Sequence, residues 1–287
     1  MKASLSIALV LSAALLSACG SSSSDDEPDP SGPTPNEESF EKFDLSVYEA
    51  KTISAETLAG TWVYMATSEY TGSSGGVEQE KSSKDKRYFV IRETDTGGLE
   101  ESGCEYSFSE AVVNGNEIEF HCELLGTIVN NEKITGTQDG DVYTFEMIKI
   151  SDSVEPIGTA NYTIAGEESV TEDVYSFYQE DSEILVKSGH AAGNHKGVFL
   201  SFGFEDHVSL IVWDNSGVDV EGHDGLTMRA GDLEFYTGHD LDEGGTGSDT
   251  ASYSMDAEST YSNTISFNGS NDSQDVSGTI QIQLPVQ

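Results

Sequence analysis

From about residue 60 onward, the chain alternates short apolar runs with polar stretches. Runs rich in Tyr, Phe, Val, Ile and Thr are separated by Gly, Asn, Asp and Ser, which is the pattern of β-strands joined by turns. No part of this region carries sustained helical periodicity. We therefore predict an all-β protein, an antiparallel barrel or sandwich built as one large or two smaller units. The expected strands are 61–70, 86–93, 103–110, 116–124, 132–137, 141–150, 159–164, 183–187, 197–204, 208–213, 232–237, 250–256, 259–267 and 276–284.

The first 18 residues follow another pattern. Lys2 precedes an apolar run from Leu5 to Leu16, which is too short for a spanning helix and is typical of a secretory signal peptide. The run ends in Leu16-Ser17-Ala18-Cys19, which resembles the lipobox of bacterial lipoproteins. The alternative is an ordinary signal peptide that is cleaved at a nearby alanine.

The lipobox resemblance implies a lipid-anchored protein. Residues 1–18 would be removed, and Cys19 would carry lipid on its sulfur and an acyl chain such as palmitate on its new amino group. More than one chain gives a stable anchor, whereas a single chain binds only marginally. Gly20 in place of Asp after the cysteine resembles the sorting pattern for the bacterial outer membrane. The resemblance leaves open whether the protein faces the periplasm or the cell surface.

The rest of the chain divides by composition. Residues 19–39 contain serines, acidic residues and four of the six prolines, and we expect a disordered tether there. The folded part is predicted to form two β units, 40–152 and 153–287. The boundary rests on a change of composition near 151–158, which includes Pro156.

The strands around the second and third cysteines predict one hairpin register. With residues 111–115 in the loop and Glu110 opposite Asn116, apolar side chains share one face and Cys104 falls opposite Cys122. An even pair of cysteines in an exported chain favours a disulfide over a metal or redox site. By the chain-entropy model, this disulfide would stabilise the fold by about 3 kcal/mol.

The balance of charge excludes one class of partner. The chain has 52 acidic residues against 13 Lys and Arg, which gives a formal net charge of -39. Such a surface repels nucleic acid and anionic lipid headgroups. We interpret the acidity mainly as a means of keeping an exported protein soluble, and the alternative is specific binding of Ca²⁺.

Leu58-Ala59-Gly60-Thr61-Trp62 resembles the start of lipocalins, in which a helical turn leads into the first barrel strand. Ser54 and Gly60 would begin and end that turn. The resemblance implies that Trp62 closes one end of a barrel whose mouth takes a small apolar ligand. It also implies a basic residue packed on Trp62, which the sequence does not identify. The alternative is a buried tryptophan in an ordinary first strand.

Five of the six histidines lie between positions 190 and 239, and two of them stand in Gly-His-Asp triplets. Imidazole and carboxylate groups could bind Zn²⁺ if their loops converged, although no local pair such as HExxH is present. The alternative is a set of solvated loop histidines. The candidate ligands are His190, His195, His223, Asp224, His239 and Asp240.

Two oxygen-rich segments, 214–219 and 268–272, are candidates for Ca²⁺. Neither follows the Asp-x-Asp-x-Asp-Gly loop, and both also fit ordinary hairpin turns.

The sequence contains no catalytic constellation. Gly-x-Ser-x-Gly is absent, and no free thiol remains once the lipid and the disulfide are counted. We therefore expect a non-catalytic binding or interaction module for a small apolar ligand or a polysaccharide. The alternative is a metal-dependent envelope hydrolase that uses the histidines of 190–240.

Overall fold

The structure is a computed structural model, and it is almost entirely β. Its one described helical element is a 3₁₀ turn, Leu45–Val47, so the prediction of an all-β fold is confirmed. The structure describes residues 45–48, 56–74, 77–103, 108–121, 124–138, 143–164, 169–187, 193–204, 210–214, 225–230, 233–240, 245–246, 249–259, 261–271 and 274–285.

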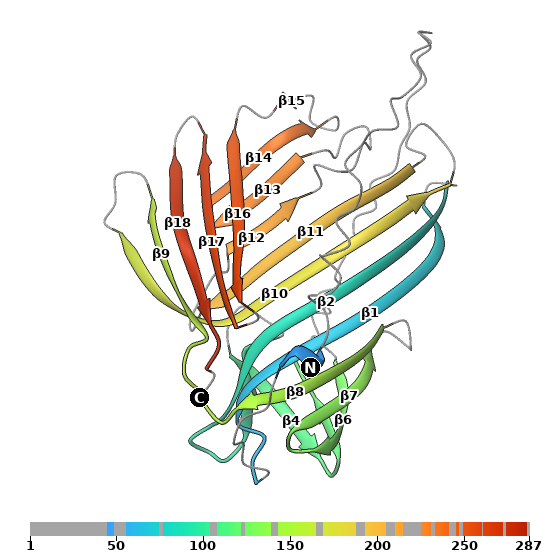
Figure 1. The fold of residues 1–287 in the computed structure, drawn as a ribbon, viewed down its shortest axis with the longest axis vertical. Helices are drawn as coiled ribbons and strands as arrows, with labels where there is room; N and C mark the ends of the chain where they lie inside the picture. The colour runs from blue at the N-terminus through green and yellow to red at the C-terminus, as the bar shows by residue number, and fades with distance from the viewer. Residues whose placement is uncertain are drawn as a thin grey trace, which may run out of the picture.

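The first eight strands form a closed antiparallel barrel (Figure 1). Each strand pairs with the next one along the chain, and the eighth pairs back with the first. Closure leaves few unpaired edges in this part of the sheet. The strands are β1 (Gly60–Ser74), β2 (Val77–Glu93), β3 (Leu99–Glu101), β4 (Ser109–Asn114), β5 (Glu117–Glu119), β6 (Leu125–Asn130), β7 (Lys133–Gln138) and β8 (Tyr143–Ser151).

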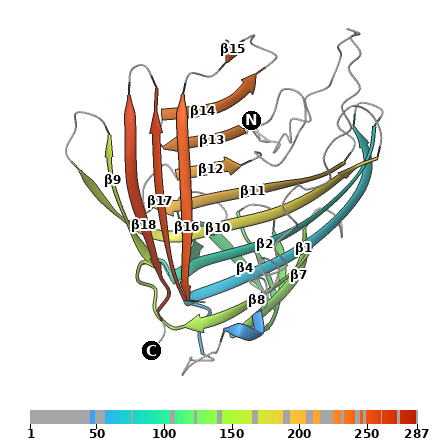
Figure 2. The same ribbon diagram turned by 45° about the horizontal axis from the view of Figure 1, so that its top comes forward.

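The remaining strands form a second antiparallel sheet that curves around its own core (Figure 2). Consecutive strands pair from β9 to β15, and β9 pairs on its other edge with β18, which continues to β17 and β16. The strands are β9 (Gly158–Ile164), β10 (Val170–Val186), β11 (Gly193–Phe204), β12 (Leu210–Asp214), β13 (Gly225–Ala230), β14 (Leu233–Asp240), β15 (Gly245–Thr246), β16 (Thr250–Ser259), β17 (Ser262–Ser270) and β18 (Asp275–Gln283).

Strand β2 joins the two units. Its last residues pair with β3 inside the first barrel, whereas 79–88 pair with 177–186 of β10. We call this β2–β10 ladder the seam. The eight-strand ring ends at Ser151 and the second sheet begins at Gly158; the division into units 40–152 and 153–287 stays a prediction.

Strands β1 and β2 serve both cores because neighbouring residues point to opposite faces. Trp62 and Phe89 belong to the core of the first barrel. Val63 and Tyr88, one position away in each strand, belong to the core of the second unit. This shared wall explains why five consecutive residues from Trp62 on are at most 8 % exposed.

The start of the described chain is fastened to the second core. The Tyr48 hydroxyl is hydrogen-bonded to that of Tyr88 at 2.5 Å, and its ring meets Tyr261 edge-on. Burial of these hydroxyls raises the pKa of Tyr48 to about 12.

No helix among the described ranges is long and apolar enough to cross a membrane.

The predicted hairpin register is wrong. Val113 pairs with Ile118 and Asn114 with Glu117, so the turn is shorter and lies further along the chain than expected. Gly115 adopts a φ of +69°, a left-handed conformation that glycine reaches without strain and that suits a two-residue hairpin turn. Cys104 and Cys122 lie outside the described residues, and the disulfide stays a prediction without the register that supported it.

Other expectations differ in detail. Residues 56–59 form a bend and a turn rather than a helical turn. Strand β10 is 17 residues long where only 183–187 was expected. Strands β3, β6, β13 and β15 lie outside the predicted set.

Candidate functional site

Charged side chains gather where β2 leaves the first barrel and meets β10. In the seam, Asp85 stands directly opposite Glu180, and Arg87 directly opposite Tyr178. Cross-strand partners lie on one face of a sheet, so these four side chains are neighbours. The same face of β2 continues into the interior of the first barrel. There Phe89, two positions after Arg87, belongs to the core. We call the group formed by Lys81, Asp85, Arg87, Tyr178 and Glu180 the seam cluster.

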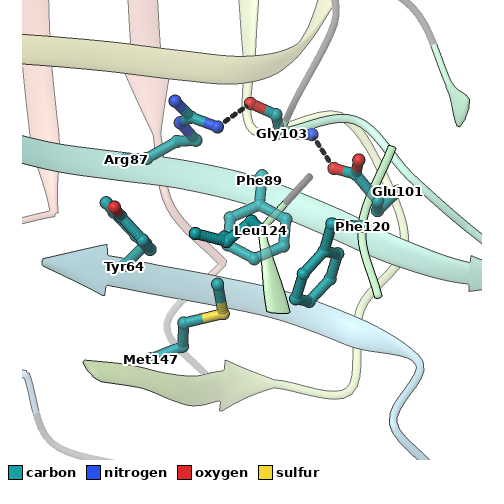
Figure 3. A pocket seen from close by; sticks show the side chains of 8 residues that line it. All are labelled: Tyr64, Arg87, Phe89, Glu101, Gly103, Phe120, Leu124 and Met147. Atoms are coloured by element: carbon teal, nitrogen blue, oxygen red, sulfur yellow. Dashed lines mark hydrogen bonds between the residues drawn. The ribbon is translucent and has the colours of Figure 1, made fainter. Parts of the chain in front are cut away.

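Arg87 is held by aromatic rings and by one carbonyl. Its guanidinium carbon lies 4.6 Å from the ring centroid of Tyr178 and 5.5 Å from that of Tyr64. One of its N–H groups donates to the carbonyl oxygen of Gly103 (Figure 3). Its buried Nε has no hydrogen-bond partner within the described part of the chain. Cation–π contacts of this kind position a guanidinium without neutralising its charge.

Asp85 is a buried carboxyl group in an unfavourable place. Asp85 is 6 % exposed, and its Oδ1 has no hydrogen-bond partner among the described residues. Burial, followed by the nearby charge of Glu180, raises the pKa of Asp85 to about 7. Arg87, a hydrogen bond with Tyr178 and the charge of Lys81 act in the opposite direction on this pKa and are outweighed.

Tyr178 connects the two carboxyl groups. Its hydroxyl donates to Glu180 Oε2 at 3.3 Å and is also hydrogen-bonded to Asp85. Lys81 Nζ donates to the other oxygen of Glu180 at 3.0 Å. Burial raises the pKa of Tyr178 well above its ordinary value, so the hydroxyl keeps its proton. The cluster can therefore hold and exchange one proton near neutral pH.

A small cavity is lined on one side by Arg87 of the seam cluster (Figure 3). Its volume is about 10 Å³, which is about the room that one water molecule needs. Pockets for drug-sized ligands measure about 300–1,000 Å³. The cavity is lined by Tyr64, Arg87, Phe89, Glu101, Gly103, Phe120, Leu124 and Met147.

Close packing explains why this space is so small. A Cβ on Gly126 would lie 2.6 Å from a methyl carbon of Ile134, and one on Gly136 would lie 2.4 Å from Cζ of Phe145. The two glycines thus make room for large side chains that fill the barrel. The described interior of the first barrel is a packed core.

Trp62 lies in this core and is 0 % exposed. Its indole N–H donates to the carbonyl oxygen of Leu58 at 2.9 Å. The structure also identifies a basic neighbour that the sequence did not: Lys149 of β8 is the cross-strand partner of Trp62. Its Nζ donates to the carbonyl oxygen of Thr57 at 3.0 Å and pairs with Asp152 at 2.6 Å.

Three of the predicted metal ligands lie on strands of the second unit. His195 lies in β11, and His239 and Asp240 lie in β14, with β12 and β13 between them in the ladder. His190, His223 and Asp224 lie outside the described residues. Within the described ranges, no three His, Cys, Asp or Glu side chains are grouped so that they could hold a metal.

One of the predicted Ca²⁺ segments forms a turn. Asn271 Oδ1 accepts a hydrogen bond from the backbone N–H of Gln274, and the Asn268 amide donates to Ser252. The first contact is typical of an asparagine in a turn, and the second joins β17 to β16. Most of the other segment, 214–219, lies outside the described residues, as does Cys19.

Comparisons with known proteins identify no family. No family model matches the chain, and no curated protein matches it. Among solved structures, it is similar to a protein of unknown function from the DUF3598 family of Nostoc punctiforme, at 8 % identity and a TM-score of 0.20. That match covers 80 % of this chain and 97 % of the other.

Sequence reasoning missed the seam cluster, although a signal was present. Five of the 13 Lys and Arg residues lie in β2, in a chain of net charge -39. So many cations on one strand indicate that carboxylates face it. The residues are Lys81, Lys84, Lys86, Arg87 and Arg92.

Proposed function

We propose that the protein is a non-catalytic binding module of the bacterial envelope, anchored through Cys19, whose binding unit is the second sheet. The proposed ligand is a small molecule with an apolar body and a polar or anionic head. One observation carries this proposal. On the inward face of the second unit, fully buried apolar residues adjoin partly exposed apolar residues. Buried polar side chains lie next to them.

The apolar part of the proposed surface comes from two walls. Val198 of β11 and Met255 of β16 are partly buried and pack against the second core. Leu200 lies two positions along β11 from Val198, and Ile265 is the cross-strand partner of Met255. Both are 0 % exposed. A surface that begins at a packed core and ends in partly exposed apolar groups suits an apolar ligand.

The polar part comes from the seam. Lys86 is 5 % exposed and Gln179 is 4 % exposed, and the two stand opposite each other on the face that carries Tyr88 and Phe177. The Gln179 amide donates to Asp181 at 3.0 Å, and Lys86 lies over the ring of Tyr88 at 5.3 Å. A ligand head that offers hydrogen-bond acceptors or a negative charge suits this polar end of the surface. The cavity of the first barrel, at about 10 Å³, is too small for such a ligand.

The anchor gives the binding unit its place. From Cys19 to Leu45 the chain advances 26 residues, a span of at most about 90 Å when fully extended. In bacteria, replacement of Cys19 with Ser is expected to move the protein from the membrane fraction to the soluble fraction. Retention of the C19S protein in the membrane would contradict lipid anchoring.

The binding proposal is tested with an anionic fluorescent amphiphile, anilinonaphthalene sulfonate, and the chain from residue 19 carrying C19S. We expect saturable binding with one site per protein and at least tenfold weaker binding by the variant Met255→Glu, which places a negative charge on the apolar wall. The matched control is Val112→Glu, at a residue that is 48 % exposed on β4 of the first barrel. Equal effects of the two variants, or no saturable binding, would contradict the proposal.

A further inference from the structure

Two carboxyl groups face each other across the seam, and one of them must be neutral. Asp85 and Glu180 are directly paired, and like charges in this position repel. When two such groups lie close together in a poorly solvated place, one holds a proton. Glu180 has Lys81 at 3.0 Å to balance its charge, whereas Asp85 is nearly buried and has an oxygen without a hydrogen-bond partner in the described part of the chain. Asp85 is therefore the group that keeps the proton.

The hydroxyl of Tyr178 makes this proton structurally important. A tyrosine has one proton to donate, and Tyr178 donates it to Glu180. The hydrogen bond between Tyr178 and Asp85 lowers the pKa of Asp85, so it is a bond to the ionised carboxylate and it draws on the same hydroxyl proton. After Asp85 loses its proton, Tyr178 can satisfy one carboxylate and must leave the other.

We propose that Asp85, Tyr178 and Glu180 form a proton-operated switch in the seam that joins the two β units. With Asp85 neutral, Tyr178 donates to Glu180 without competition, and Lys81 donates to the other oxygen of Glu180. With Asp85 ionised, two carboxylates compete for one hydroxyl, and the seam opens more often. The proposal does not depend on the proposed ligand.

The surroundings of Asp85 support this assignment. Lys81 and Arg87 on β2 favour the ionised form, and Glu180 and burial oppose it, with the net result that the pKa of Asp85 rises to about 7. From β1, Ala66 stands opposite Asp85, and Tyr64 is the ionisable residue whose charge acts on the cluster. When the seam opens, water reaches Asp85 and its pKa returns toward 3.8. The open form therefore binds fewer protons, and a rise in pH favours it up to about pH 7.

The test is amide hydrogen exchange on the C19S chain from residue 19. Protection factors, which correct for the intrinsic effect of pH, are compared at pH 6 and pH 8. For the amides of β2 and β10 we expect a loss of about tenfold over this range. The amides of β17 and β18, which have no part in the seam, serve as an internal control and are expected to change little.

Two variants decide whether Asp85 is responsible. Asp85→Asn keeps the shape of the side chain and removes the titration, so the difference between pH 6 and pH 8 is expected to disappear. Glu180→Gln removes the opposing charge, so the loss of protection is expected at lower pH. An unchanged pH dependence in D85N would assign the effect to histidines and overturn the proposal. Constant protection in the unmodified chain would overturn it as well.

Discussion

Trp62 and Lys149 are cross-strand partners at one end of the first barrel, and both bind the same preceding segment. The indole donates to the carbonyl of Leu58, and the ammonium group donates to the carbonyl of Thr57. Both side chains are 0 % exposed. This pair fastens the segment before β1 to the first barrel. It gives the Gly-Thr-Trp sequence a structural role that requires no ligand.

Replacement of Lys149 with Met is expected to destabilise the protein by about 3–5 kcal/mol. The change leaves the Thr57 carbonyl without its buried donor and removes the partner of Asp152. The measurement is urea unfolding at pH 7. Glu146→Gln is the control, because the Glu146 side chain is 41 % exposed in its ion pair with Lys133 and its loss is expected to cost about 1 kcal/mol or less. Equal losses for both variants would show that Lys149 is not held as described.

Gly126 and Ile134 are expected to show strong coupling in a double-mutant cycle. A Cβ on Gly126 would lie 2.6 Å from Cγ2 of Ile134, so Gly126→Ala should cost about 1–3 kcal/mol by overpacking. Ile134→Ala alone should cost about 2–5 kcal/mol by leaving a cavity. In the double variant the new methyl group occupies part of that cavity, so the loss should be smaller than the sum. Additive losses would contradict the packed interior of the barrel.

The fold class followed from the sequence because alternation is strongest where one face of a strand meets water. Strand β18 shows this, with Val276, Ile280 and Ile282 buried between exposed polar residues. Strand β10 was mostly missed for the opposite reason. It carries Glu172, Glu180 and other acids inside a strand that lies between two neighbours, and acids in such a place break the expected pattern.

The hairpin register could not be fixed by alternation alone. Two registers each place apolar residues on one face, and the sequence does not say which neighbouring core receives them. Phe108, expected in the hairpin core, packs against the second core instead, while Ala111, expected in the loop, is buried in the first. The seam cluster was beyond reach for a related reason, since Asp85 and Glu180 are 95 positions apart in sequence and meet only through the β2–β10 pairing.

The disulfide between Cys104 and Cys122 remains a prediction from cysteine count and export. In the C19S chain we expect no free thiol under native oxidising conditions and two free thiols after reduction. Reduction is expected to lower the free energy of unfolding by about 3 kcal/mol. Thiol titration of the unfolded protein, with and without reductant, is the measurement. Two free thiols without reductant would exclude the disulfide.

Replacement of Asp85 with Asn is expected to change how stability depends on pH. The pKa of Asp85 is about 7 in the folded protein against an ordinary 3.8, so the folded state binds more protons between these values and its stability falls as pH rises. The stabilising contribution of this proton is complete below about pH 4 and lost above about pH 7. Relative to the unmodified chain, D85N should therefore gain stability across this window, by at most about 4 kcal/mol. Urea unfolding of both proteins from pH 4 to pH 8 provides the measurement, and parallel curves would show that Asp85 is ionised throughout.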